Sequence, residues 1–346
     1  MTSTIALDAV TSLRAHRRRR TTAVLGVALV AIVVLAVLSL VLGAANVTPV
    51  RALAAVFGVG DGGDVFVVQR LRLPRVLAAL LAGGGFALAG ALFQSTLRNP
   101  LASPDILGIS SGASLGAVWA ILGLGLHGYV VAGFALGGAL AAALAIWVLA
   151  WRRGLHSIRF VLVGVGISYV CGSMLAWLLA RAEVRDAQTA LLWTIGSVAD
   201  VRGTSLTLLA AGVLGLGACA ALVSHTQAAL SLGDDNAAAL GVRVHAVRVT
   251  TLLLAVGLVA VATSATGPIA FVALVAPPIA RRLLDDGRAD LLASVVVGAL
   301  LVLTADLIGQ HGPFTAPVGV VTGLVGAPYL LWLLSGRSAS GKKVRA

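Results

Sequence analysis

Long apolar runs separated by short polar segments dominate this sequence. A membrane-spanning helix needs roughly 20 predominantly apolar residues. The runs do not alternate apolar and polar positions as membrane β-strands do. The pattern therefore predicts an all-α, polytopic membrane protein with about ten transmembrane helices, at 21–45, 76–93, 105–126, 128–150, 160–180, 204–224, 249–266, 268–284, 289–309 and 318–335.

One polar stretch interrupts this pattern between the sixth and seventh runs. Residues 230–244 read LSLGDDNAAALGVRV, where Asp234 and Asp235 suit the start of a helix, the alanines favour its interior and Gly241 suits its end. A helix of about seven residues is not stable alone in water. We therefore expect it to pack on a neighbour, either as an ordinary interfacial loop of its own protein or against a partner.

Composition and charge agree with a bilayer as the solvent. Hydrophobic residues make up 59% of the 346 residues and charged residues only 11%, against about 25% charged in soluble domains. With the N-terminus inside, the inner segments hold 18 of the 25 Lys and Arg residues and the outer segments hold 7. This bias predicts cytoplasmic termini and a cytoplasmic 230–244 stretch, and it explains the net charge of +12 better than nucleic-acid binding does.

The chain divides into three expected parts. Residues 1–20 form a basic cytoplasmic segment, 21–335 form the ten-helix membrane domain, and 336–346 form a basic cytoplasmic tail. The run that follows the N-terminal arginines exceeds 20 residues, whereas the apolar core of a cleavable signal has about 7–15. We therefore expect 21–45 to remain as the first span.

Groups that could carry catalysis or bind a metal are scarce. Asp306 is the acid placed well inside an apolar run, and the two cysteines lie in apolar runs where packing explains them. The tail GRSASGKK lacks the Ser or Thr and the flanking strand and helix of a phosphate-binding loop. We expect no catalytic residue, no metal site and no ATPase in this chain. The scarcity also counts against a proton-coupled secondary carrier, which remains one alternative beside a membrane scaffold without transport activity.

Eight motifs follow one another along residues 70–335. They are RLPR (72–75), GALFQ (90–94), NPLASP (99–104), LGISSGA (107–113), LLWTIGS (191–197), LGDDNAAALGV (232–242), GPIAFVALVAP with IAR (267–281), and PVGVVTGLVGAP (317–328). In this order the set resembles the FecCD-type permeases of bacterial ABC importers, which take up iron-siderophores and cobalamin.

The resemblance implies a subunit that forms a transport pathway with a second permease in the bacterial plasma (inner) membrane. Two cytoplasmic ABC ATPases would hydrolyse ATP with Mg²⁺, and an external binding protein would deliver the substrate. This chain itself would bind no cofactor. An iron(III)-siderophore is the expected cargo, with cobalamin or haem as the alternatives.

The resemblance also assigns roles to particular positions. The 232–242 stretch would be the helix that couples to the ATPase, with contacts expected at Leu232, Gly233, Asp234, Asp235, Ala238, Leu240 and Gly241. Arg72 and Arg75 would dock the binding protein, although arginines near a helix end can also anchor it at the lipid headgroups. His156 and Ser157 would lie at a cytoplasmic gate, where an ordinary interfacial histidine is the simpler alternative.

Three positions depart from the family pattern. Gln310 stands where an arginine is frequent, Thr315 replaces an acid, and Pro278 replaces a common histidine. A missing outer arginine would weaken one contact with the binding protein. We therefore expect this chain to work beside a different permease, as a heterodimer rather than a homodimer.

Overall fold

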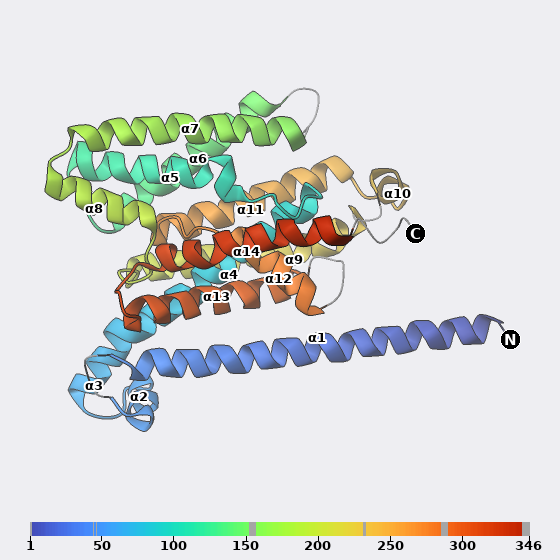
Figure 1. Cartoon of the computed structure of the whole chain (residues 1–346), viewed down its shortest axis with the longest axis horizontal. Helices are drawn as coiled ribbons and strands as arrows, with labels where there is room; N and C mark the ends of the chain where they lie inside the picture. The colour runs from blue at the N-terminus through green and yellow to red at the C-terminus, as the bar shows by residue number, and fades with distance from the viewer. Residues whose placement is uncertain are drawn as a thin grey trace.

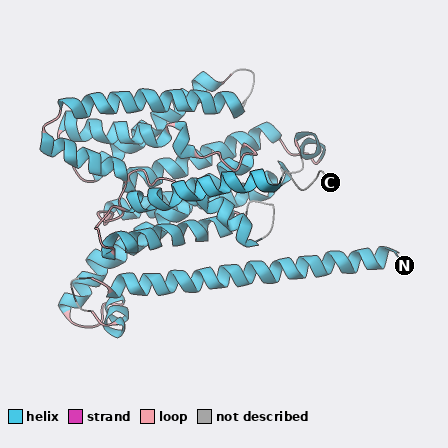
Figure 2. Cartoon of the chain, in the orientation of Figure 1, coloured by secondary structure: helices cyan, strands magenta, loops and turns pink. Residues whose placement is uncertain are grey.

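The computed structural model is a bundle of helices (Figures 1 and 2), and it describes residues 2–43, 45, 47–151, 157–230, 233–284 and 290–340. No strand occurs among these residues. The elements are α1 (Thr2–Val41), α2 (Pro49–Val56), α3 (Gly62–Phe66), the π-helix η1 (Val67–Arg72), α4 (Leu73–Thr96), the 3₁₀-helix η2 (Pro104–Leu107), α5 (Ile109–Val118), the π-helix η3 (Trp119–Gly123), α6 (Tyr129–Ala150), α7 (Ser157–Arg181), α8 (Val184–Ile195), α9 (Thr204–Leu230), α10 (Asp234–Ala239), α11 (Val244–Thr266), α12 (Val272–Leu284), α13 (Leu291–His311) and α14 (Val318–Ser340).

Each of the ten predicted runs coincides with a helix, which confirms the all-α, polytopic fold. Within the described part of the chain, seven helical stretches are long and apolar enough to cross a membrane. Two shorter apolar stretches, Ile109–Gly123 and Val318–Trp332, account for the third and tenth runs. The eighth run was predicted too long, because α12 begins only at Val272, after Phe271 with a φ of 66°.

The two ends of the bundle carry different short helices. Helices α2, α3 and α8 lie at one end, while α10 lies at the other, together with the N-terminal end of α1 and the C-terminal end of α14 (Figure 1). The sequence pattern did not predict α2, α3 or α8, because they are too short to give a run of membrane length. The arrangement agrees with an even number of crossings.

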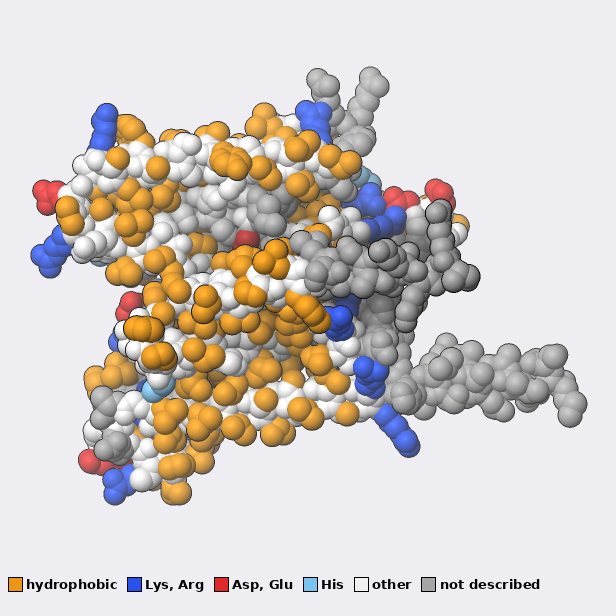
Figure 3. Space-filling view, in the orientation of Figure 1, with side chains coloured by type: hydrophobic (Ala, Val, Ile, Leu, Met, Phe, Trp, Pro, Cys, Tyr) orange, Lys and Arg blue, Asp and Glu red, His pale blue; other side chains and the backbone are white. Residues whose placement is uncertain are grey.

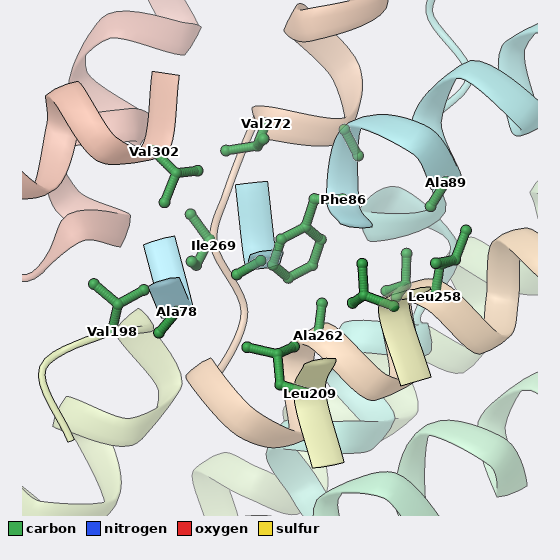
Figure 4. Close-up of a cluster of buried hydrophobic side chains, with 14 of the residues drawn as sticks. Ala78, Phe86, Ala89, Val198, Leu209, Leu258, Ala262, Ile269, Val272 and Val302 are labelled. Atoms are coloured by element: carbon green, nitrogen blue, oxygen red, sulfur yellow. The ribbon is translucent and has the colours of Figure 1, made fainter. Parts of the chain in front are cut away.

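Helix α4 is the centre of the bundle and packs against α9, α11, α12 and α13. Glycine permits this closeness: Gly83 of α4 meets the backbone of Gly298 on α13, and Gly90 meets the backbone of Ala273 on α12. Small residues let membrane helices approach in this way. Around Phe86, apolar side chains from α4, α9, α11, α12 and α13 fill the remaining space (Figure 4).

The glycines that recur every four residues serve packing in most cases. A Cβ on Gly112 or Gly116 of α5 would collide with the backbone of α6, and one on Gly319 would collide with the backbone at Ile195. Gly323 faces open space instead. A Cβ on Gly108 would lie 2.9 Å from the backbone of α7 at Gly164 and Ser168. The spacing therefore marks close helix contacts at four of the five positions and names no substrate.

Two adjacent prolines interrupt the hydrogen bonding of α12. Pro277 and Pro278 have no N–H to donate to the carbonyl groups four residues earlier, Ala273 and Leu274. The Gln94 amide supplies the missing donor, at 3.4 Å from the Ala273 oxygen and 3.0 Å from the Leu274 oxygen. Arg281 in turn donates to Gln94 Oε1 at 2.7 Å. This cross-link fixes the C-terminal end of α4 to α12.

The outside of the bundle is apolar. Orange hydrophobic side chains cover the flanks of the visible face, and most of the charged side chains lie toward its two ends (Figure 3). Val27, Leu162 and Leu222, from three different helices, are each more than 60% exposed. A surface of this kind requires lipid around it, so the chain is a multi-pass membrane protein.

Candidate functional site

The short helix α10 is built as the sequence predicts. Asp234 and Asp235 lie in its first turn, and Gly241, with a φ of 81°, ends it. The Val242 N–H bonds the Ala237 carbonyl at 3.0 Å and the Gly241 N–H bonds the Ala238 carbonyl at 2.9 Å. This is the double hydrogen bond of a glycine-terminated helix, so the predicted stop at Gly241 is confirmed.

Helix α10 is held by one carboxylate between two arginines. Arg98 Nη2 lies 2.6 Å from Asp234 Oδ1, and Arg248 Nη2 lies 3.1 Å from both Asp234 oxygens. Arg98 follows α4, whereas Arg248 belongs to the first turns of α11. The side chain of Ala237, on the inner face of α10, is fully buried. These contacts fix α10 to two membrane helices at once.

The end of α4 explains the reach of Arg98. The Asn99 N–H bonds the Gln94 carbonyl at 3.1 Å and the Arg98 N–H bonds the Ser95 carbonyl at 3.4 Å, which places Arg98 where glycine is usual, with a φ of 50°. Arg98 Nη2 also donates to the Leu230 carbonyl at 2.7 Å. The arginine thus joins the ends of α4 and α9 to the start of α10.

The electrostatics of Asp234 follow from this arrangement. Loss of solvation alone would raise the pKa of its carboxyl, but the charges and hydrogen bonds of Arg248 and Arg98 outweigh that effect and lower the pKa below its ordinary value. The carboxylate therefore stays ionised throughout the neutral range, and both bonds to it remain charge-assisted.

The remaining residues predicted for coupling divide by exposure. Asp235, Ala238 and Gly241 are exposed, and Leu240 is 66% exposed although it is a large apolar side chain. Gly233 is partly exposed, with a φ of 102° immediately before the helix. Leu232 lies outside the described residues. The outward face of α10 is thus small, apolar at its end and without a covering element in the described part of the chain.

Arg72 and Arg75 lie at the opposite end of the bundle, where both guanidinium groups bond within the chain. Arg72 Nη1 donates to the Leu40 and Val41 carbonyls at 2.6 and 3.0 Å, and its Nη2 donates to the Ala45 carbonyl at 2.9 Å. Cations are favourable beside the last carbonyl groups of a helix, so Arg72 caps α1.

Arg75 forms an ion pair that the sequence reasoning missed. Its partner is Asp306 of α13, a side chain only 2% exposed. Gln310, which replaces a frequent family arginine, donates to Asp306 Oδ2 at 2.7 Å. An acid within an apolar run needs a cationic or hydrogen-bonding partner, and that rule would have prompted a search for a partner of Asp306.

Only one of the two residues expected at the cytoplasmic gate lies among the described residues. His156 lies outside the described residues, and the backbone of Ser157 begins α7. Arg98 and Arg248, which hold α10, are further residues that sequence reasoning did not single out. Arg248, 14 positions after Asp234, lay within reach of a local search, whereas Arg98 lies 136 positions before Asp234 and gave no local signal.

Comparisons with known proteins agree with this architecture. Residues 31–336 match the model of the FecCD transport family. The chain is 40% identical over 294 residues to the ferric enterobactin transport system permease protein FepG of Escherichia coli K12, covering 84% of this chain and 89% of that protein. It is 38% identical over 314 residues to the ferric enterobactin permease FepD of the same organism, covering 88% and 92%.

A solved structure shares the fold. A metal-chelate type ABC transporter in an inward-facing conformation superposes with a TM-score of 0.80 at 25% identity, covering 90% of this chain and 98% of the other. Taken with the family match over most of the sequence, these likenesses show that the chain is a transport permease and belongs to the FecCD transport family.

Proposed function

We propose that this chain is a membrane permease subunit of a binding-protein-dependent ABC importer for an iron(III)-siderophore. The observation that carries the proposal is the mounting of α10. One carboxylate fixes this short helix to α4 and α11, while Ala238 and Leu240 face outward. A short helix that is attached to two membrane helices can transmit force to both of them as a rigid unit.

The path of such a force follows from packing. Arg98 receives it from Asp234, and α4 lies behind Arg98 in contact with α9, α11, α12 and α13. The rigid cross-link from Gln94 to α12 carries it further. Displacement of α10 would therefore tilt a large part of the bundle together, which is what alternating access requires.

The partners of this mechanism are a second permease subunit, two cytoplasmic ABC ATPases and an external binding protein. The ATPases would supply ATP and Mg²⁺ chemistry, and this chain would bind no cofactor. We favour a heterodimer because two different relatives from one organism, FepG and FepD, are both named as permeases of the ferric enterobactin transport system. Gln310 and Thr315, in place of charged residues, also suit pairing with a chain that carries a fuller docking set.

Two further roles belong to the proposal. Arg72 and Arg75 would guide the binding protein at the outer end, where the side chain of Arg75 is still 25% exposed beside Asp306. Rim charges of this kind mainly steer encounter and fix orientation. His156 and Ser157 would line a gate at the other end. Both termini would be cytoplasmic, in a bacterial plasma membrane.

The assignment of substrate comes from the relatives. FepG and FepD are ferric enterobactin permeases by name, and the ferric hydroxamate permease FhuG of Bacillus subtilis is 35% identical over 322 residues. Cobalamin and haem are the alternative cargoes. In the test, the complete transporter is placed in vesicles with its ATPases and ATP in the lumen. These vesicles should accumulate radioactive iron supplied outside as its siderophore complex.

The same vesicles separate the alternatives. Uptake that continues without ATP and collapses with the proton gradient would identify a secondary carrier instead. Sidedness can be measured on a chain in which Cys171 and Cys219 are replaced by alanine. A membrane-impermeant maleimide should label Ala238→Cys only from the cytoplasmic side, and Val184→Cys, at the opposite end, only from outside. The reverse labelling would contradict the orientation.

A further inference from the structure

A groove of about 1070 Å³ runs along the side of the bundle, with α4 as its floor and α9 and α13 as its walls. Leu214 and Leu292, on the two walls, are 65% and 61% exposed. The groove therefore opens sideways, toward the apolar surface that requires lipid.

The lining of the groove changes from apolar to polar along α4. The part farther from α10 is lined by Leu80, Leu81 and Leu88, and the part nearer to α10 is lined by Gln94 and Ser95. Fifteen residues of helix separate Leu80 from Ser95, or about 22 Å. One leaflet of hydrocarbon is about 15 Å deep. The lining thus extends over more than the depth of one leaflet and reaches the bundle end that carries α10.

Two arginines stand at the polar end. Arg98, with 48% of its side chain exposed, is held by Leu230 and Asp234, while Arg281 donates to Gln94 Oε1. Asp290 is the acidic residue among the described lining residues. Its carboxylate accepts a bond from the Ala293 N–H at 3.0 Å, at the start of α13. Asp234 is shared by Arg98 and Arg248, so the three described arginines at this end (Arg98, Arg248 and Arg281) exceed the two described acids (Asp234 and Asp290) by one.

Small residues leave room beside the apolar part. Gly84 of α4, together with Gly217, Ala218 and Ala221 of α9, lines the groove without filling it. A Cβ placed on Gly217 would meet Leu88 at 3.7 Å, an ordinary contact. A methyl group therefore fits at this position, whereas a branched side chain would occupy the groove itself.

We propose that this groove binds one anionic phospholipid of the leaflet at the α10 end. Its phosphate lies against Arg98 and Arg281, and an acyl chain follows α4 between α9 and α13. Basic pockets between membrane helices recognise anionic headgroups, and the planar guanidinium suits a phosphate. Because Arg98 also bonds Asp234, the bound lipid lies next to the mounting of α10.

Lipid retention by the purified, complete transporter tests this proposal. The protein is incubated in mild detergent with equal amounts of phosphatidylglycerol and phosphatidylcholine, and bound lipid is counted by native mass spectrometry. We expect phosphatidylglycerol to be retained preferentially. Arg98→Gln and Arg281→Gln should each lower its retention by about fivefold, since one basic residue contributes roughly 1 kcal/mol near an anionic headgroup.

Controls address charge, folding and the acyl chain. Arg19→Gln removes an exposed arginine of α1 outside the groove and should leave retention unchanged, while Arg281→Lys should restore most of it. Gly217→Leu should lower retention with both arginines present. Each variant is first required to match the thermal unfolding midpoint of the unchanged protein.

Three outcomes would overturn the proposal. Phosphatidylcholine could be retained equally well, or Arg19→Gln could lower retention as strongly as the groove variants. Millimolar inorganic phosphate could bind and displace phosphatidylglycerol while Gly217→Leu has no effect, which would identify a free anion site. The proposal uses the membrane placement of the proposed function but needs no uptake measurement. A failure of iron uptake with normal lipid retention would therefore leave it standing.

Discussion

Arg75 and Asp306 form a two-pronged ion pair between α4 and α13, with Nε 3.0 Å from Oδ2 and Nη2 2.8 Å from Oδ1. The carboxylate is almost fully buried, and the arginine is partly exposed at the end of the bundle opposite α10. One residue of the proposed docking pair thus also joins two central helices.

Removing one partner of this pair should be costly. Arg75→Met leaves Asp306 buried with Gln310 as its remaining hydrogen-bond donor, and we expect a loss of about 3 kcal/mol in the free energy of unfolding. Arg75→Met combined with Asp306→Leu should recover most of that loss, because an apolar pair can replace an ion pair. Denaturant unfolding in detergent measures both.

The double variant also separates stability from docking. If Arg75 guides the binding protein, the folded double variant should still bind it several-fold more weakly than the unchanged complex. Equal binding by the double variant and the unchanged complex would assign Arg75 to structure alone.

Arg72 should hold the end of α1. Arg72→Gln removes the cation that bonds the Leu40, Val41 and Ala45 carbonyls, at a cost of about 2 kcal/mol. We expect faster amide hydrogen exchange in residues 38–45, with no change in α6. Exchange that rises equally in α6 would indicate general unfolding and contradict a local cap.

A bulky charge on α10 should disconnect the membrane domain from the ATPases. Ala238→Arg places a long side chain on the outward face of α10, so iron uptake should fall to the level of vesicles that lack the transporter. Ala23→Arg, the same change at an exposed position of α1, should retain uptake. Membrane insertion of both is checked by protease protection, and normal uptake by Ala238→Arg would exclude α10 as the coupling element.

The mounting of α10 should depend on pH in the acidic range only. A carboxyl with a lowered pKa in the folded protein contributes stability above its unfolded pKa, near 3.9, and loses it as pH falls through the folded value. A nitroxide label at Ala239→Cys should therefore stay immobile from pH 7 to 5 and become mobile only as the pH falls below that unfolded value. With Asp234→Asn it should be mobile throughout, and a transition near neutrality would refute the assignment.

Close packing of α4 should make Gly90 intolerant of any side chain. The Cβ of Gly90→Ala would enter the space of the Ala273 carbonyl, and neither backbone can retreat cheaply, so we expect a loss of about 3 kcal/mol. Gly215→Ala, in α9 with open space around it, should stay within about 1 kcal/mol of the unchanged protein. Thermal unfolding of the two variants in one detergent provides the comparison.

The fold was predictable because the bilayer imposes it locally. A run such as 204–224 is helical in any membrane protein, since its backbone must satisfy its own hydrogen bonds there. The acids, alanines and closing glycine that give α10 its bounds lie within one another's reach. These elements can therefore be predicted from local sequence, without knowing which distant residues they contact.

The ion pairs that join α10 to α4 and α4 to α13 could not be predicted from local sequence. Arg75 and Asp306 are 231 positions apart, and Arg98 and Asp234 are 136 apart. Their pairing depends on α4 lying at the centre of the bundle, which single apolar runs do not specify. Only the general demand of a buried charge for a partner could have suggested the first pair.

The amide of Gln94 and the two prolines of α12 are tied by shared carbonyl groups, and this tie constrains how the sequence can change. If a residue with a backbone N–H replaced Pro278, that N–H could donate to the Leu274 carbonyl. The bond from the Gln94 amide to the same carbonyl would then no longer be needed. If Gln94 changed first, two buried oxygens would be stranded beside an interrupted helix. We therefore expect replacement of Gln94 to be less harmful in a chain whose Pro278 has already been replaced by a residue with an N–H than in the unchanged chain.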